Sequence, residues 1–192
     1  MTDSPVERAT ETDVPRERKV EDLYGMIDEI GTCMFTTRRG DGLLVSRPMQ
    51  VQIRTDDGEL WFVTDEATAK LDELDTDPHV NLAFFDPDSR EWISVSGIAH
   101  PTRDRERIRA LHEPSWRAWF PDEGGNRDGG PDDPRIVLIR VAPVTVTYLR
   151  NDTPRPIAMF RVASAAAKGE ARELGSLRHV TERELDVHAD QE

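Results

Sequence analysis

Arg47 and Lys70 are the two side chains whose type and setting best suit chemistry on an anion. Arg47 lies in the segment LLVSRPMQVQI, from Leu43 to Ile53, whose composition predicts a β-strand. Alternate strand residues share a face, and Arg47 is the only polar member of an otherwise apolar face. A guanidinium is rarely buried without a partner, so either Arg47 forms an ion pair at a sheet edge or an anion binds it. We favour the anion, because perturbed charged groups gather at functional sites.

Pro48 follows Arg47 in the same predicted strand. A proline has no backbone N–H to donate to a β-ladder. The strand is therefore expected at a sheet edge, at a bulge, or along the lining of a site.

Lys70 is the only lysine within the predicted strand-bearing core, since the chain has just two others, Lys19 and Lys168. Thr64 and Thr68 offer hydroxyl groups nearby in the sequence, and the start of a helix offers unpaired backbone donors. If the strands bearing Arg47 and Thr64 pair with each other, both cations converge on one phosphate.

A solvated helix provides the alternative for Lys70, in which its ammonium pairs with Glu66, Glu73 or Asp77. Taken alone, Lys70 fits this ion-pair alternative better. Taken together with Arg47, it favours a phosphate site.

The composition indicates one domain with tails and a strongly acidic surface. The chain has 192 residues and a formal net charge of −13, from 38 acidic and 25 basic residues. This balance argues against nucleic acid as a partner, because phosphate backbones require a basic surface. Acidic residues combined with so few lysines suggest adaptation to a high-salt cytoplasm, a halophilic character. The alternative is an acidic protein whose arginine bias reflects codon composition.

Cysteine and histidine usage gives no sign of a metal site. Cys33 is the only cysteine and lies in an apolar run, which is typical of a small buried side chain. The five histidines have no metal-ligand spacing, so we predict no metal. The sequence also contains no apolar run long enough to span a membrane and no signal peptide, so we expect a cytoplasmic protein.

Hydrophobic periodicity predicts six strands with helices between them. An amphipathic helix is expected over 20–30, ending near Gly31, with further short helices after Asp65 and over 104–111. The six predicted strands are Thr32–Thr37, Leu43–Ile53, Glu59–Thr64, Val80–Phe85, Trp92–His100 and Ile136–Leu149, the last bent at Pro143. The first three are expected to form an antiparallel meander, and all six an antiparallel barrel or half-barrel with flanking helices.

Three segments are expected along the chain. Residues 1–19 are polar and are predicted to form a flexible N-terminal arm, followed by the strand-bearing domain over 20–150. Residues 151–192 are predicted to contain a helix over 157–173 and then a frayed, charged tail.

An ordered set of short motifs carries a resemblance to a known family. The motifs, from about residue 20 to residue 150, are SRPM, ELWFVT, ATAK, DPHVNLAFF, WISVSG, WRAWFP and DDPRIVLIRVAP. Together they resemble the pyridoxamine 5'-phosphate oxidase-like, FMN-binding split-barrel superfamily, and most closely its general stress protein 26 branch. The resemblance implies a mainly β (α+β) fold, a six-stranded antiparallel split β-barrel with flanking helices. It also implies a homodimer with two FMN sites at the subunit interface.

The resemblance assigns residues to the FMN site. Arg47 matches the family arginine on the FMN phosphate, and Lys70 matches the lysine of the family's S-R-K motif, with Thr68 in place of its serine. The other residues that it assigns are Pro48, Met49, Gln50, Val63, Thr64, Trp92 and Ser94. Residues 48–50 would lie along the isoalloxazine ring. Val63 and Thr64 would present backbone and hydroxyl groups to the flavin. Trp92 and Ser94 would reach the site from the partner subunit.

Three departures from the family's oxidases argue against oxidation of vitamin B6. Ala69 stands where those oxidases have a second cation, and their R-L-H substrate segment has no counterpart around residues 131–135. Leu149 stands where a late tryptophan is frequent. The other prominent aromatic residues are predicted to belong to the core or the dimer interface, and these are Trp61, Trp116, Trp119 and Phe120.

The sequence therefore predicts an FMN-binding flavoprotein of general-stress-protein type, an oxidoreductase whose chemistry resides in the cofactor. No side chain is assigned as a catalytic acid, base or nucleophile. One alternative is a reductase that uses the deazaflavin F420, which relatives of this barrel also bind. The other is a dimer without catalysis, either storing or sensing flavin or lacking a cofactor.

Overall fold

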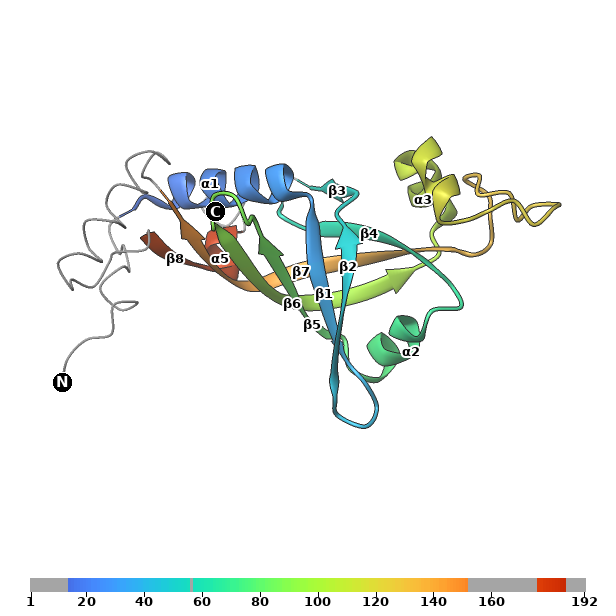
Figure 1. Ribbon diagram of the computed structural model, residues 1–192, viewed down its shortest axis with the longest axis horizontal. Helices are drawn as coiled ribbons and strands as arrows, with labels where there is room; N and C mark the ends of the chain where they lie inside the picture. The colour runs from blue at the N-terminus through green and yellow to red at the C-terminus, as the bar shows by residue number, and fades with distance from the viewer. Residues whose placement is uncertain (1–13, 56, 152–175, 186–192) are drawn as a thin grey trace.

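The computed structural model describes residues 14–55, 57–151 and 176–185 of the chain. One strongly curved antiparallel sheet dominates the fold, with short helices at its ends (Figure 1). Its strands are β1 (Thr32–Arg38), β2 (Leu44–Gln50), β3 (Ile53–Arg54), β4 (Leu60–Asp65), β5 (His79–Phe85), β6 (Trp92–Thr102), β7 (Ile136–Arg150) and β8 (Ser176–Thr181). The helices are α1 (Arg16–Ile30), α2 (Ala69–Thr76), α3 (Arg105–Leu111), the 3-10 helix η2 (Pro114–Ala118) and α5 (Glu182–Leu185).

The order of the strands makes the sheet close on itself. Neighbouring strands follow the order β2-β1-β5-β6-β7-β4-β3, and β8 also pairs with β7. The two edges, β2 and β3, are joined by only Val51 and Gln52, so the chain steps directly from one edge to the other. The Val51 amide donates to Gly31 O over 2.8 Å, and the Gln52 amide donates to Trp61 O over 2.8 Å. The predicted split-barrel fold, mainly β with flanking helices, is confirmed.

The six predicted strands all form, but two details of the prediction were wrong. The segment from Leu43 to Ile53 is two strands rather than one, because the amides of Val51 and Gln52 leave the ladder for other partners. The predicted meander is confirmed only in part, since β2 pairs with β1 as expected, but β4 pairs with β7 and the short β3 and not with β2. The second neighbour of β1 is β5, whose buried face completes the same core.

The ends of the described chain contain more structure than the sequence predicted. Helix α1 begins at Arg16, directly after Pro15, and ends as predicted at Gly31, whose positive φ of 66° forms the C-cap. Strand β8 and helix α5 form where a charged tail was expected. Their apolar residues Leu177, Val180 and Leu185 are buried, and this burial outweighs the surrounding charge. The helix predicted over 157–173 lies outside the described residues.

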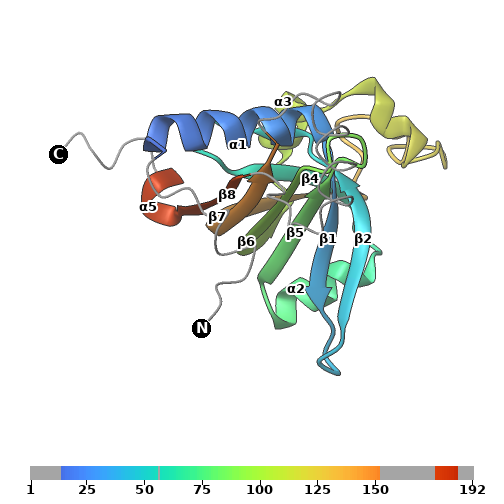
Figure 2. The same ribbon diagram turned by 60° about the vertical axis from the view of Figure 1, so that its left-hand side comes forward.

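Two apolar clusters hold the elements together. The larger fills the inside of the curved sheet beneath α1, and Phe35 and Phe62 meet there edge to face with centroids 5.2 Å apart. In Figure 2, α1 lies across one end of the sheet, while α2 lies beside the opposite end of β1. The smaller cluster joins Trp61 of β4 to Trp116 and Phe120 in and after η2. It fixes η2 against the outer face of β4.

The sheet has one irregularity, at the position of the predicted bend. Strand β7 is continuous, but its register with β6 shifts between Ser96 and Gly97, and Gly97 lies opposite Pro143. A Cβ on Gly97 would lie 2.5 Å from the carbonyl oxygen of Ala142, so only glycine fits this close approach.

Candidate functional site

A pocket of about 230 Å³ lies between β2, β4, the start of α2 and the segment after η2. Its lining residues are Pro48, Met49, Gln50, Gln52, Val63, Thr64, Asp65, Thr68, Lys70, Trp119 and Phe120. Seven of the ten residues predicted from the sequence are among them, since only Arg47, Trp92 and Ser94 are absent from the lining. The curvature of the sheet explains this, because it brings β2 beside β4 although the two strands are not ladder neighbours.

The turn between β4 and α2 places the polar residues of the pocket. Thr68, rather than Asp65, is the residue before the first turn of α2, with extended backbone angles of φ −82° and ψ 135°. Its hydroxyl donates to Asp65 O over 2.9 Å, and the Asp65 carboxylate accepts from the Ala67 amide over 2.8 Å. The turn is thereby closed by its own side chains and carries Lys70 in toward β4.

Lys70 is 9% exposed, and its ammonium donates to the Thr64 hydroxyl over 2.5 Å. The Thr64 and Thr68 hydroxyl oxygens are 3.2 Å apart, so the three side chains form one group. Burial, followed by repulsion from Arg47, lowers the pKa of Lys70 to about 8, against the attraction of Asp65 and Glu73. Among the described residues no carboxylate forms an ion pair with this ammonium.

The acidic residues that the ion-pair alternative assigned to Lys70 bind other cations. Glu73 pairs with Arg47, Asp77 with Arg38, and Glu66 lies 3.9 Å from Arg127. Lys70 is thus a buried cation with hydroxyl neighbours and no counter-ion within the described chain. Such a group is suited to bind an anion.

Arg47 lies beside the pocket and is held by a carboxylate. Its guanidinium donates to Glu73 Oε2 over 2.8 Å and to the Thr37 hydroxyl over 2.9 Å, and Thr37 donates to Glu73 over 2.5 Å. Burial alone would raise the pKa of Glu73, but hydrogen bonds from Thr37 and Arg47 hold that pKa below its ordinary value. The ion pair at a sheet edge is therefore the arrangement in this structure. A contact between Arg47 and a bound phosphate stays a prediction.

Sequence reasoning missed four residues of the pocket wall, namely Gln52, Asp65, Trp119 and Phe120. Trp119 is 67% exposed, and Phe120 beside it is buried in the smaller apolar cluster. The indole N–H of Trp116 donates to Gln52 Oε1 over 2.6 Å and fixes η2 beside the pocket. The WRAWFP motif carried this information, but its aromatic residues were assigned to the core or the dimer interface.

A buried ion pair anchors the chain behind Phe120. Asp133 is 0% and Arg135 is 2% exposed, and their side chains meet over 2.6 Å. Arg135 also donates to Pro121 O over 2.8 Å, and the Gly129 amide donates to Asp133 over 2.8 Å. Burial raises the pKa of Asp133, but hydrogen bonds from Arg135 and Gly129 outweigh it and lower that pKa to about 2.

Trp92 and Ser94 lie on β6, away from this pocket. Trp92 is paired with Phe85 and Leu149 on the neighbouring strands, and the Ser94 hydroxyl accepts from Asn81 over 2.8 Å. Neither residue lines the pocket of its own protomer. Their approach to the site from a second subunit stays a prediction.

The described residues contain neither a metal-binding cluster nor a membrane-spanning helix. No group of three or more His, Cys, Asp or Glu side chains in the described ranges is arranged to hold a metal ion. No helix in those ranges is both long enough and apolar enough to cross a membrane.

Comparison with known proteins agrees with the fold of the sheet. The sequence matches the family model described as "Pyridoxamine 5'-phosphate oxidase like" over residues 18–173. It is 35% identical over 178 residues to Protein bli-3 of Neurospora crassa. The aligned region covers 91% of this chain and 85% of that protein.

Solved structures share the fold. The general stress FMN/FAD binding protein from Xanthomonas citri superposes with a TM-score of 0.60 at 25% identity, covering 72% of this chain and 92% of that one. General Stress Protein 26 from Bacillus anthracis gives a TM-score of 0.58 at 24% identity, covering 68% and 93%. An FMN binding protein from Nostoc punctiforme gives a TM-score of 0.54 at 16% identity, and the match covers 72% of this chain and 85% of that one. The last two likenesses concern the fold alone.

We expect the substitution Asp133→Asn to lower the free energy of unfolding by about 3–5 kcal/mol, because it removes the buried partner of Arg135 and leaves only the half-exposed Glu123, 3.0 Å away. The stabilisation is present above the unfolded pKa of about 3.9 and is lost as the pH falls toward the folded pKa. Urea denaturation at pH 7 measures the effect. Asp132→Asn is the matched control, since the pair of Asp132 with Arg109 is exposed and contributes only about 0–1 kcal/mol. Equal losses in both variants would contradict the assignment.

Proposed function

Because the chain belongs to the pyridoxamine 5'-phosphate oxidase-like family, we propose that the pocket between β2, β4 and α2 binds FMN. The observation that carries the proposal is the Lys70 ammonium, which is buried beside two hydroxyl groups and has no carboxylate partner among the described residues. The FMN/FAD binding relative from Xanthomonas citri supports a flavin as the ligand.

The polar end of the pocket suits the phosphate of FMN. A phosphate monoester carries a charge of about −1.5 to −2 at pH 7 and three strong acceptor oxygens. Lys70 supplies a charged donor, and the Thr64 hydroxyl can supply a second by turning away from Thr68, whose own hydroxyl donates to Asp65 O. Charge-assisted hydrogen bonds of this kind are about twice as strong as neutral ones.

The rest of the pocket suits a flat ring with polar edges. Pro48, Met49, Val63 and Phe120 give apolar walls, and Gln50 supplies an amide that can meet the ring's oxygen and nitrogen atoms. Trp119 lies exposed at the rim. This division, with charge at one end and apolar walls at the other, matches the two halves of FMN.

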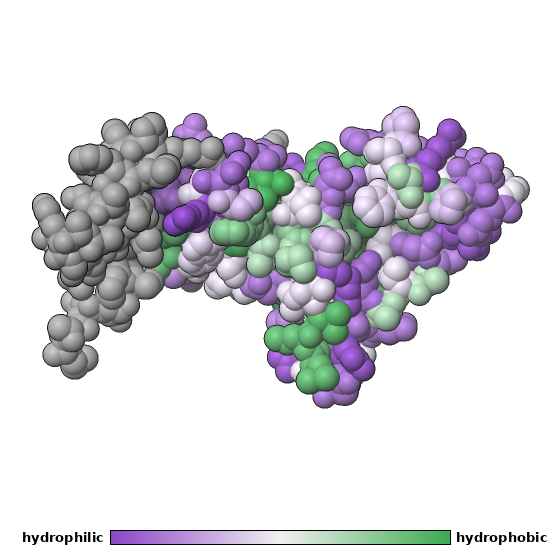
Figure 3. Space-filling view, viewed as in Figure 1, coloured by the Kyte–Doolittle hydropathy of each residue, from purple (hydrophilic) through white to green (hydrophobic). Residues whose placement is uncertain are grey.

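A second copy of the chain is proposed to complete the site. The pocket volume of about 230 Å³ is below the range of about 300–1,000 Å³ that is usual for a whole cofactor. Hydrophobic side chains gather over the β1–β2 hairpin (Figure 3), where Met34, Leu43 and Leu44 are 42%, 62% and 66% exposed. Contact through this surface would form a homodimer and allow Trp92 and Ser94 of one subunit to approach the flavin of the other.

The proposed activity is that of an oxidoreductase with a substrate still to be identified. Bound FMN supplies one- and two-electron redox chemistry, which no protein side chain replaces. The residues of this chain bind the phosphate, orient the ring and exclude water from one of its faces. No side chain is proposed as an acid or base on the substrate, and the missing second cation at Ala69 argues against a vitamin B6 substrate.

The first test is titration of the purified protein with FMN, followed by the quenching of tryptophan fluorescence. We expect saturable binding, and we expect Lys70→Met to weaken it by about 1.5–3 kcal/mol, roughly 10- to 100-fold, through loss of a charge-assisted hydrogen bond. Lys19→Met is the control, because Lys19 pairs with Glu184, away from the pocket. A wild-type protein that binds no FMN sinks the proposal. Binding of F420 instead would select the deazaflavin alternative, and bound FMN without NAD(P)H turnover would favour flavin storage.

Arg47→Ala separates the two roles open to this side chain. If Arg47 leaves Glu73 to contact the phosphate, Arg47→Ala weakens FMN binding by about 1.5–3 kcal/mol. Glu73→Gln then strengthens binding, because it frees the guanidinium from its present partner. Isothermal titration calorimetry of both variants measures the changes. Unchanged affinity in Arg47→Ala would show that Arg47 only positions α2.

The affinity for FMN should fall as the pH rises above about 8. Lys70 has a pKa lowered to about 8, so its ammonium is lost in this range, while the phosphate keeps its charge above its second pKa of about 6. A bound phosphate favours the charged ammonium and raises its pKa in the complex, so the affinity falls from the ligand-free pKa of about 8 and levels off only at the higher pKa of the complex. Binding measured between pH 7 and pH 10 tests this, with Lys70→Arg as the control that retains its charge throughout. A fall of equal size in that variant would assign the pH dependence to another group.

A further inference from the structure

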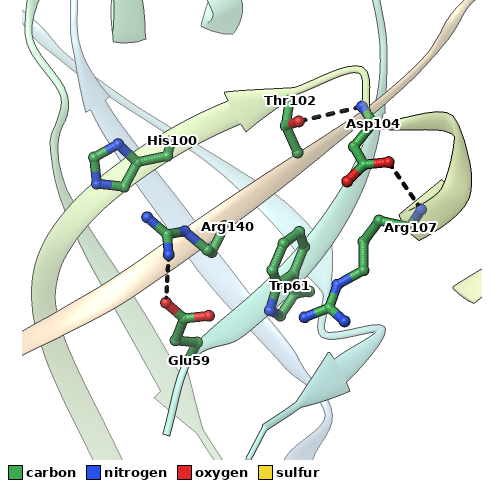
Figure 4. A pocket seen from close by; sticks show the side chains of 7 residues that line it. All are labelled: Glu59, Trp61, His100, Thr102, Asp104, Arg107 and Arg140. Atoms are coloured by element: carbon green, nitrogen blue, oxygen red, sulfur yellow. Dashed lines mark hydrogen bonds and ion pairs between the residues drawn. The ribbon is translucent and has the colours of Figure 1, made fainter. Parts of the chain in front are cut away.

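A second and larger pocket, of about 480 Å³, lies where α3 meets the strands β4, β6 and β7 (Figure 4). It shares no lining residue with the proposed flavin pocket. Its lining residues are Glu59, Trp61, His100, Thr102, Asp104, Arg107 and Arg140. The volume is within the range of about 300–1,000 Å³ that is usual for small-molecule sites.

The sheet register builds the floor of this pocket. Trp61 of β4 is paired with Arg140 of β7, and Arg140 is paired with His100 of β6, so the three side chains lie in one line across three strands. Helix α3 brings Arg107 to the other side of Trp61. In Figure 4 the indole ring lies between the pair Glu59–Arg140 and the Arg107 guanidinium.

The acidic side chains of the pocket are already engaged. Glu59 accepts from Arg140 over 2.8 Å. Asp104 is the N-cap of α3, and its carboxylate accepts from the amides of Glu106 and Arg107 over 3.0 and 3.1 Å. Glu59 is therefore neutralised by Arg140, while Asp104 uses its Oδ1 to hold the start of α3.

Arg107 is the cation that remains. Its guanidinium carbon lies 4.6 Å from the centre of the Trp61 ring, and within the described ranges this guanidinium forms no ion pair. The chain has 38 acidic residues, yet this pocket holds an arginine with no carboxylate partner. A guanidinium presents five donors in a planar fork that suits carboxylate and phosphate groups.

Trp61 provides a second, independent observation. The residue is 6% exposed, and its Nε1 has no hydrogen-bond partner in the part of the chain that the structure describes. A buried donor without a partner costs about 1–3 kcal/mol, and an indole N–H can only donate. Arg107 lies over the same ring, so a charged donor and a buried donor without a partner are neighbours in this pocket.

We propose that this pocket binds a small organic oxyanion, a carboxylate or a phosphate ester, between Arg107 and Trp61. The groups free to act on it, which are the Arg107 guanidinium, the Trp61 N–H and the His100 ring, can all donate hydrogen bonds. Glu59 fixes Arg140 in the floor, and Asp104 fixes the start of α3. The site is separate from the flavin pocket and does not depend on the proposed flavin chemistry.

The indole N–H resonances of the four tryptophans in the ¹⁵N-labelled full chain test the proposal. Inorganic phosphate and citrate are titrated separately at constant ionic strength, with chloride as the balancing anion. Trp61→Phe identifies the Trp61 resonance by its disappearance. We expect one of the two probes to shift that resonance saturably, and the probe that does so distinguishes phosphate from carboxylate recognition.

Arg107→Gln should weaken this binding at least 10-fold, and Arg103→Gln should leave it unchanged because Arg103 is exposed and lies outside the pocket. Unchanged positions of the Trp92 and Trp116 resonances in both variants show that the fold is intact. A Trp61 shift that does not saturate, or that persists at full affinity in Arg107→Gln, overturns the proposal. A shift of Trp119 alone also overturns it, since Trp119 lines the flavin pocket and would report an anion there.

Discussion

The step of the chain from β2 to β3 is the constraint on which the rest of the architecture depends. Only Val51 and Gln52 separate strands that lie at opposite edges of the sheet order, so the sheet must curl until those edges meet. Curling encloses the larger apolar cluster beneath α1. It also brings the Pro48–Gln50 end of β2 beside β4, and the proposed flavin pocket forms at this seam rather than on a flat sheet face.

The distribution of charge along the seam gives the pocket its character. Arg47 and Lys70 are close enough for their charges to interact, but within the described part of the chain only Arg47 has a carboxylate partner. Glu73 therefore neutralises Arg47. The buried Lys70 ammonium keeps its charge and is the group that can bind an anion. The chain as a whole is acidic, but the pocket is locally positive at Lys70. This difference arises because Glu73 reaches Arg47 and not Lys70, and it does not follow from the composition.

Much of the fold and most of the candidate pocket could be predicted, because alternation and turn chemistry are local. The strands and the C-cap at Gly31 follow from short segments of sequence, whereas the seven pocket residues were assigned largely through the resemblance to the family. The partner of Arg47 did not follow, since Glu73 lies 26 residues away and reaches it only through the curl of the sheet. The same holds for Trp119, which joins the pocket because Trp116 binds Gln52 from a distant segment. The burial of Leu177 and Val180 in β8 could not be predicted, because charged residues surround them in the sequence and their burial depends on the pairing of β8 with β7.

Strand β8 has a consequence for solubility. Along β7, β4 pairs with residues 136–141 and β8 pairs with residues 145–150, so the two short strands divide the same edge between them. A protein lacking β8 would present six consecutive residues of β7 with open backbone donors and acceptors, a ready template for another strand. The segment 176–181 covers these groups of β7 and becomes the outer strand there, and the buried ion pair between Arg178 and Asp22 joins this strand to α1.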